Sequence, residues 1–150
     1  MAAYCSAEEV RTMIKDDLVN AILGDEYIDD VSEREAKLME LSEGAILDAD
    51  AEINGYLSKR YRLPFDNPPA VLNKFSKDIA VYNLVSRIGI DESERDKTFL
   101  NRYNAAIKFL TLVAEGKIDI GVYEPQKVSA SGFRMDSGRR RFSRDSLRGW

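Results

Sequence analysis

The strongest constraint on the fold is a helical spacing of apolar residues that stops at the stretch LPFDNPPA. The three prolines of this stretch cannot occupy a helix interior, so it separates two helices. The first helix begins at the capping box Ser32–Glu35 and is predicted to extend to about Tyr61. Unbroken, it would be about 40 Å long, more than a small body covers, so Gly44 is the expected point of division. Its apolar face consists of Leu38, Leu41, Ala45, Ala49, Ile53, Tyr56 and Leu57.

The remaining helices are predicted from the same spacing and from signals at their ends. The capping box Ser6-Ala7-Glu8-Glu9 opens a short helix. Pro69 is placed as the first residue of the next helix, whose apolar face lies within residues 70–88, and a last helix follows the charged connection DESERDK. The expected ends of these three helices are Gly24, Gly89 and Gly116. Their apolar faces consist of Val10, Met13, Ile14, Leu18, Ala21 and Ile22, then Val71, Leu72, Phe75, Ile79, Tyr82 and Val85, then Phe99, Tyr103, Ala106, Ile107, Leu110 and Val113.

The apolar spacing changes after Gly116. Ile118, Ile120 and Val122 alternate with other residues, which predicts a short strand. Further on, Asp136-Ser137-Gly138 fits a three-residue hairpin loop between residues 127–135 and 139–145. The predicted fold class is therefore mainly α, a small helical bundle with a short β segment and an extended C-terminal arm that can form a β-hairpin. The helical body is assigned to residues 1–125 and the arm to residues 126–150.

Charge is divided unevenly between these two parts. Residues 126–150 contain seven basic and two acidic residues, a net charge of +5. Because the whole chain carries −4, residues 1–125 carry −9. The sequence therefore describes an acidic body followed by a basic arm.

Residue types that carry chemistry are scarce. The chain has no histidine, the commonest general base, and a single cysteine, Cys5, which we interpret as a small hydrophobe near a helix start, in a reducing compartment, rather than a reactive thiol. The densest carboxylate cluster, Asp48, Asp50 and Glu52, is interpreted as a solvated helix face rather than a metal site or an acid-base pair. No apolar run is long enough to cross a membrane. We expect no enzyme activity, cofactor, metal or membrane partner.

The arm combines arginine with apolar anchors, which are the residues enriched at protein interfaces. A solubilising tail and a nucleic-acid grip are the alternatives, and three consecutive arginines suit phosphate binding. Tyr56, Arg60 and Tyr61 could also stack on bases, although Tyr56 continues an apolar face, so we assign them to structure. The residues predicted to dock the arm are Arg139, Arg140, Arg141, Phe142, Arg144, Leu147, Arg148 and Trp150.

Short motifs along nearly the whole chain also carry a resemblance. The most specific is the terminal Phe142-Ser143-Arg144-Asp145-Ser146-Leu147-Arg148-Gly149 with Trp150 after it. The others are Tyr4-Cys5-Ser6, Ala51-Glu52-Ile53-Asn54-Gly55-Tyr56-Leu57, Arg60-Tyr61, Leu63-Pro64, Asp78-Ile79-Ala80, Tyr103, Ala105-Ala106 and Ala114-Glu115-Gly116-Lys117. On these residues the chain resembles the Mu-like tailed-phage neck protein family, long described as a domain of unknown function of Mu-like prophages. The charged 24–44 region departs from that pattern.

The resemblance implies a structural, non-catalytic subunit of the head-to-tail connector, an adaptor that joins capsid to tail. Such subunits form a homo-oligomeric ring, commonly twelve-fold, beneath the portal protein and beside tail-side neck proteins. The implied location is the virion neck, and the host bacterial cytoplasm during assembly. DNA would pass through the ring without specific binding, since an acidic lining repels it. The alternative function is a nucleic-acid-associated protein that binds DNA through the arginine-rich arm.

Overall fold

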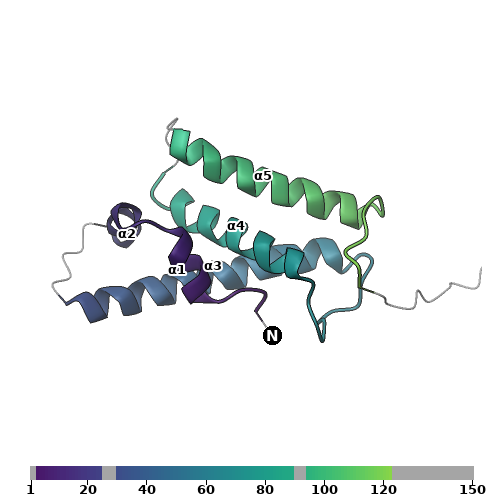
Figure 1. Cartoon of the computed structure of the whole chain (residues 1–150), viewed down its shortest axis with the longest axis horizontal. Coiled ribbons are helices and arrows are strands. Elements are labelled where there is room, and N and C mark those ends of the chain that lie inside the picture. Colours follow the sequence, from purple (N-terminus) through teal and green to yellow (C-terminus); the bar gives the residue numbers. More distant parts are fainter. Residues whose placement is uncertain (1–2, 25–29, 90–93, 123–150) are drawn as a thin grey trace, which may run out of the picture.

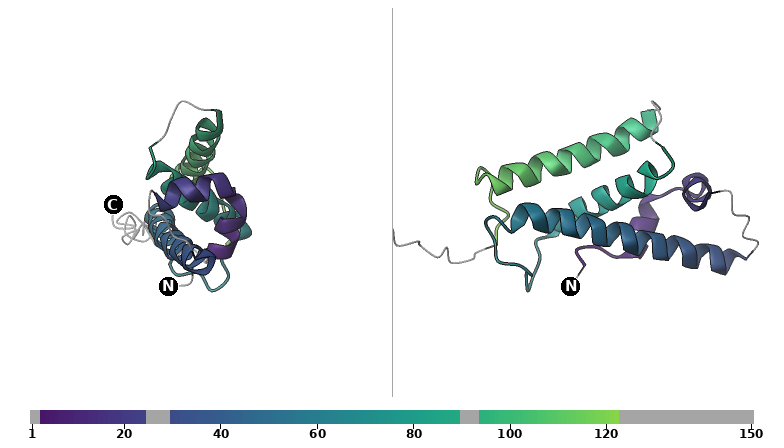
Figure 2. Two further views of the ribbon diagram at one scale, coloured as in Figure 1. Left: turned by 90° about the vertical axis from the view of Figure 1, so that its left-hand side faces the viewer. Right: turned by 180° about the vertical axis from the view of Figure 1, so that it is seen from behind.

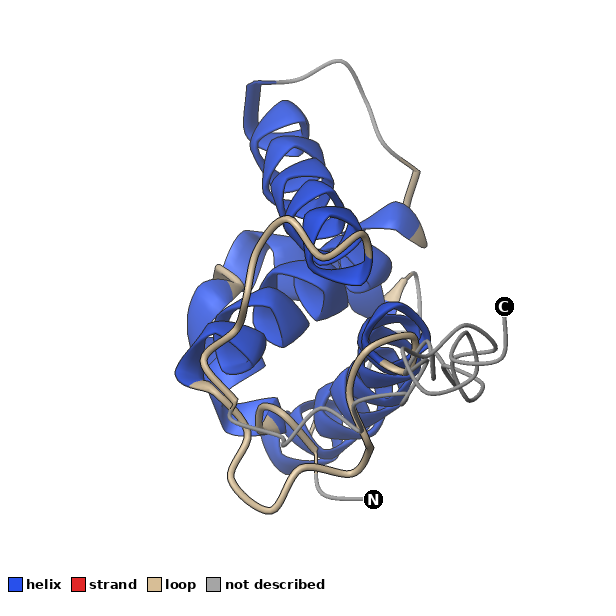
Figure 3. Ribbon diagram, turned by 90° about the vertical axis from the view of Figure 1, so that its right-hand side faces the viewer, coloured by secondary structure: helices blue, strands red, loops and turns tan. Residues whose placement is uncertain are grey.

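The computed structural model describes residues 3–24, 30–89 and 94–122 of the chain, and these residues form five helices and no strand (Figures 1 and 3). The mainly helical fold class is thereby confirmed. The predicted hairpin, the boundary at residue 125 and the whole arm lie outside the described residues. The helices are α1 (Ala7–Met13), α2 (Asp16–Leu23), α3 (Val31–Leu57), α4 (Ala70–Ser86) and α5 (Glu94–Ala114).

Helix α4 lies between the two long helices α3 and α5 (Figure 1). The same order is seen from behind, where α5, α4 and α3 follow one another across the molecule (Figure 2). Helix α1 packs on both α3 and α4, and α2 contacts the same pair. The body is therefore a helical bundle in which α4 is covered from several sides. None of the helices within the described residues is both long and apolar enough to span a membrane.

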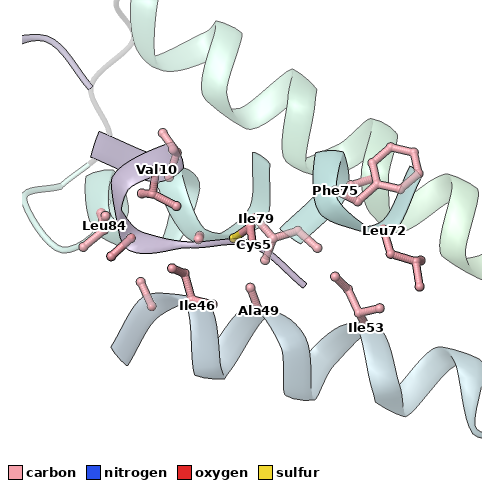
Figure 4. Packing of buried hydrophobic residues seen from close by; sticks show 14 of the residues in the cluster. Cys5, Val10, Ile46, Ala49, Ile53, Leu72, Phe75, Ile79 and Leu84 are labelled. Carbon is pink, nitrogen blue, oxygen red and sulfur yellow. The ribbon is translucent and has the colours of Figure 1, made fainter. Parts of the chain in front are cut away.

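The core is built from the predicted apolar faces. Figure 4 shows the side chains of Ile46, Ala49 and Ile53 on α3 directed at α4. Burying a large aliphatic side chain completely stabilises a fold by about 1.5–3 kcal/mol, so Ile46 and Ile53 each contribute substantially to stability. Leu72 and Ile79 of α4 lie opposite these residues in this view, whereas the ring of Phe75 points away from α3 and contacts Phe109 of α5, with 4.8 Å between the ring centroids. Leu84 of α4 and Val10 of α1 lie at one end of the same core.

The segment from Ser6 to Gly24 forms two helices, so the prediction of a single helix there was wrong. The Ser6–Glu9 capping box is present as predicted, but Ile14 has an extended backbone and ends α1. Arg11 holds this corner: its guanidinium donates to the carbonyl of Ile14 at 3.0 Å and to the carboxylate of Asp16 at 2.7 Å. Asp16 also lies in the first turn of α2, where the helix dipole favours a carboxylate.

Helix α3 runs unbroken through Gly44, so the predicted division there was also wrong. Its first turn is solvent-exposed, and from Leu38 onward one face is covered by neighbouring helices. The helix begins one residue before the predicted capping box, because the side chain of Asp30 accepts from the amide of Ser32 at 2.9 Å. This hydrogen bond lowers the pKa of Asp30.

The predicted strand after Gly116 is absent from the described residues. Residues 115–122 instead form turns and loop, and Ile120 alone of the three alternating residues is fully packed into the core. Arg60 fastens this segment, since its Nη1 donates to the carbonyls of Val113 and Ile118, both at 3.1 Å. Gly116 supplies the positive φ of 82° that the turn requires, as expected for a helix end.

Candidate functional site

A buried polar cluster ties the chain start to the centre of the bundle. The backbone amide of Tyr4 donates to Asp50 Oδ2 at 2.9 Å, and its hydroxyl donates to Asn54 Oδ1 at 2.6 Å. Both acceptors lie on α3, one turn apart. The side chain of Asn73 on α4 donates to the carbonyl of Tyr4 at 2.9 Å. We call Tyr4, Cys5, Asp50, Asn54, Asn73 and Ser76 the N-terminal clasp.

The clasp continues inward as a chain of hydrogen bonds from Cys5 through Ser76 to Asp50. Ser76 Oγ donates to Asp50 Oδ1 at 2.6 Å, and Cys5 Sγ lies 3.2 Å from Ser76 Oγ. A serine hydroxyl has one proton, so Cys5 is the donor to Ser76. Burial raises the pKa of the Cys5 thiol and outweighs the opposing effect of the Ser76 hydrogen bond. The thiol therefore stays protonated near neutral pH, which agrees with its interpretation as a structural residue.

Glu9 joins the clasp to the start of α1. Its carboxylate accepts from the amide of Ser6 at 2.9 Å and from Asn73 Nδ2 at 3.1 Å, and Lys77 Nζ lies 3.5 Å away. The Ser6 hydrogen bond, followed by that of Asn73, lowers the pKa of Glu9. One carboxylate thus caps α1 and fixes it to α4.

The predicted carboxylate cluster of Asp48, Asp50 and Glu52 is not one site. Asp48 is exposed, as expected, but Asp50 is buried within the clasp, which corrects its interpretation as solvated. Glu52 Oε1 accepts from the hydroxyl of Tyr103 at 3.1 Å. Burial, and then this hydrogen bond, raise the pKa of Tyr103 to about 12. Within the described residues, no group of three His, Cys, Asp or Glu side chains could hold a metal ion.

Tyr56, Arg60 and Tyr61 serve the fold in the way their structural interpretation predicted. Arg60 donates to the carbonyls of Val113, near the end of α5, and of Ile118, after it, and lies 5.5 Å from the ring centroid of Tyr61. Tyr61 is buried, and its ring contacts Phe65 edge-on at 6.0 Å. These contacts leave Tyr61 no open ring face for a base.

A groove lies between α3 and α4. We call it the α3–α4 groove, and its volume is about 430 Å³. Its charged lining residues are Glu40 and Asp48 of α3 and Arg87, the C-cap residue of α4. The lining residues are Glu40, Leu41, Gly44, Ala45 and Asp48 of α3, and Asn83, Ser86 and Arg87 of α4 and its end.

The outer surface of α3 beside the groove carries an exposed large apolar side chain and two glycines further along the helix face. Leu47 leaves 64% of its surface exposed. Gly44 and Gly55 have nothing within 4 Å of where a Cβ would stand, so packing within the subunit does not require glycine at either position. Glycine inside a helix costs about 1 kcal/mol relative to alanine. No contact within the subunit compensates for this cost at Gly44 or Gly55.

The sequence prediction found neither the clasp nor the groove. The only sequence signal for the groove was Gly44, which we had interpreted as a helix division. Asn73 and Ser76 carried no signal, because their partners lie more than twenty residues away. The eight predicted docking residues between Arg139 and Trp150 lie outside the described residues, so their docking stays a prediction.

Comparison with known proteins identifies the family. Residues 4–136, which include every residue of the clasp and the groove, match the family described as Bacteriophage Mu, Gp36. The chain belongs to this family. It is 33% identical over 118 residues to the Mu-like prophage FluMu protein gp36 of Haemophilus influenzae, a match that covers 77% of each chain. It is 30% identical over 92 residues to Gene product J of Escherichia phage Mu, which covers 61% of each.

Membership of the Bacteriophage Mu Gp36 family confirms the resemblance to Mu-like phage proteins, and the chain is a phage protein of this kind. Within it, the clasp contains Tyr4, Cys5 and Asn54, three of the residues that carried the resemblance. Their contacts explain why these residue types belong together: each supports the packing of the chain start on α3 and α4. The clasp is therefore a structural feature of the body.

Proposed function

We propose that this protein is a structural subunit of the phage head-to-tail connector, which forms a ring beneath the portal and joins capsid to tail. It would act in the virion neck, after assembly in the host bacterial cytoplasm, without catalysing a reaction. Membership of a Mu-like phage family supports the setting. The observation that carries the proposal is the opposition of charge between a body at −9 and an arm at +5.

Opposite charges on two parts of one chain suit a repeating contact between copies. If the basic arm of each subunit binds the acidic body of the next, every copy makes the same head-to-tail contact. Such heterologous contacts close into a ring when the rotation per subunit permits. The arm supplies the arginine and aromatic anchors that such an interface needs.

The acidic body also suits a ring through which DNA passes. Five exposed carboxylates of α3 stand against two basic residues on the same helix. A surface of this sign repels the phosphate backbone, so DNA would move through the ring without specific binding. Portal and tail-side neck proteins would be the protein partners of the two ring faces.

The direct experiment is recruitment to rings of the cognate portal protein. Purified full-length protein should bind portal rings in a stoichiometric ring, visible by negative-stain or cryo-electron microscopy. Deleting residues 126–150 should abolish recruitment while the circular dichroism spectrum and melting temperature of the body stay nearly unchanged. An absence of binding to cognate portal and tail components by the intact protein would contradict the connector function.

Trp150 offers a second readout, because it is the only tryptophan. Docking should bury it, shift its emission to shorter wavelength and protect it from quenchers, and Trp150→Ala should weaken assembly. Tight DNA binding with a steep dependence on salt, lost with the arm, would instead favour the nucleic-acid alternative, since phosphate contacts release counterions.

A further inference from the structure

The α3–α4 groove combines three properties of a peptide-binding surface. Its volume of about 430 Å³ lies within the range of pockets that take up ligand groups. Its uncharged lining residues on α3 are Leu41, Gly44 and Ala45, which we call the floor. Glu40 and Asp48 stand eight residues apart on α3, so they lie about 12 Å from each other along the helix. A lining with uncharged residues, two carboxylates and one arginine, Arg87, fits a segment that combines several arginines with apolar side chains.

We propose that the α3–α4 groove of one subunit is the docking site for the arm of a second copy, with its end segment, residues 139–150, as the bound part. This rests on the proposed connector function and names the surface that the ring contact uses. Trp150 and Leu147 supply apolar groups for the floor, and the neighbouring arginines supply partners for Glu40 and Asp48. Exposed Leu47 borders the same surface and adds apolar contact area.

Charge complementarity favours this occupant over another partner. Helix α3 carries five exposed carboxylates and two basic residues, and the segment from Arg139 to Trp150 carries five arginines and one aspartate. On the α4 side of the groove, the hydroxyl of Ser86 and the side-chain amide of Asn83 offer hydrogen-bond partners to a peptide backbone. A nucleic acid would meet like charge at Glu40 and Asp48.

The positions of the groove and of the last described residues favour a second copy. The described chain ends at Val122, just after Ile120 meets Tyr61 near the C-terminal end of α3. The groove covers residues 40–48, about 14–26 Å from the end of α3 at Leu57. An arm that starts at one end of the body and a receptor nearer the other allow a heterologous contact between copies, which closes into a ring when the rotation per subunit permits.

Disulfide trapping in the portal-bound assembly tests the site. Two differently tagged subunits are mixed, one with Gly44→Cys in the groove and one with Gly149→Cys, which preserves Trp150 as an anchor. Gly44 has open space for a side chain, and native Cys5 is buried and so does not compete. Oxidation should give a cross-linked product that carries both tags.

Gly55→Cys is the matched control. It lies on the same helix, eleven residues or about 17 Å away, and it also has open space for a side chain. The Gly44 pair should cross-link several-fold more than the Gly55 pair. A stronger product with Gly55, or equal products, would overturn the groove as the receptor. Cross-linking only within a chain, seen when both cysteines are placed in one subunit, would overturn the second copy as the occupant.

A charge swap gives an independent test. Glu40→Lys with Asp48→Lys should weaken ring formation about tenfold or more, because like charges would face each other. Arg139→Glu with Arg140→Glu should do the same, and a mixture of the two variants should recover assembly. The control pair Glu33→Lys with Asp66→Lys changes exposed carboxylates outside the groove and should have little effect.

The outcomes separate the two proposals. Recruitment of the wild type to portal rings, without groove cross-links and without recovery by the charge swap, would leave the connector function intact and overturn the groove assignment. Failure of the wild type to bind any neck component would contradict the connector function itself. Recruitment together with groove-specific cross-links and recovery supports both.

Discussion

Asp50 on α3 accepts a hydrogen bond from the backbone amide of Tyr4, 46 residues earlier in the chain, at 2.9 Å. Its second oxygen accepts from Ser76 on α4 at 2.6 Å, so one carboxylate joins three segments. No buried side-chain nitrogen or oxygen in the described ranges lacks a hydrogen-bond partner. The clasp is therefore a fully satisfied polar network inside an apolar bundle, and removal of its central acceptor should be costly.

We predict that Asp50→Ala lowers the free energy of unfolding by roughly 2–4 kcal/mol, because Tyr4 and Ser76 would each lose their acceptor. Asp50→Asn should lose less, since the amide keeps one acceptor oxygen. Urea unfolding followed by circular dichroism measures both. The control is Asp48→Ala, two residues away and exposed, which should change stability by at most about 0.5 kcal/mol. Equal effects at the two positions would mean that the clasp contributes nothing.

Arg60 is predicted to hold the segment after α5. Arg60→Ala removes the hydrogen bonds to the carbonyls of Val113 and Ile118 and should destabilise the body by roughly 1–2 kcal/mol. Hydrogen exchange should show faster opening of residues 116–122, with little change in α3 and α4. Lys59→Ala, at the exposed neighbouring position, should leave exchange there as it is. Protection of residues 116–122 that survives Arg60→Ala would refute this role.

The sequence predicted the features that local chemistry decides. The capping box at Ser6, the helix end at Gly116 and the proline-rich break between α3 and α4 all depend on a few adjacent residues, and all are present. Pro69 stands one residue before its predicted place, as the N-cap of α4. These signals locate the helices but do not say which faces meet.

The errors arose where distant contacts decide. The break at Ile14 depends on Arg11, which also contacts Glu35 on α3 at 3.3 Å, and a periodic pattern does not contain that contact. Gly44 stays helical because α3 is supported by packing on either side of it. Asp50 is buried because the chain start covers it. The alternating apolar residues Ile118, Ile120 and Val122 do not form a strand, because only Ile120 is buried and it lies in a loop.

Glu9 is predicted to make stability depend on acid pH. Its folded-state pKa lies below the ordinary value of 4.5, mainly through the hydrogen bond from the Ser6 amide. Its contribution is therefore fully present above that value and is lost as pH falls through the lower folded-state pKa. Glu9→Gln keeps an acceptor but does not titrate, so its stability should fall less between about pH 5 and pH 3. Thermal melts across this range measure the difference.

Glu8→Gln is the control for this experiment. Glu8 is the neighbouring, exposed carboxylate and takes no part in the capping box. This variant should retain the wild-type loss of stability between pH 5 and pH 3. A wild-type slope in Glu9→Gln as well would show that other carboxylates control acid unfolding.

The two glycines of α3 should be replaceable at a gain in stability. Gly44→Ala and Gly55→Ala should each raise the free energy of unfolding by about 0.5–1 kcal/mol, because alanine favours the helix and meets nothing within 4 Å. Gly116→Ala should instead cost about 1–2 kcal/mol, since its φ of 82° disfavours a Cβ. Chemical denaturation of the three variants tests both signs in one experiment.

Gly44 and Gly55 should have the same effect on stability when replaced, but different effects on assembly. Gly44 lies on the floor of the α3–α4 groove, whereas Gly55 lies about 17 Å further along the helix. A larger side chain at the floor would occupy the space proposed for the arm of a second copy. Gly44→Leu should therefore weaken recruitment to portal rings severalfold while the body stays folded, and Gly55→Leu should assemble as the wild type does. Equal assembly of the two leucine variants would show that the groove is not filled in the connector.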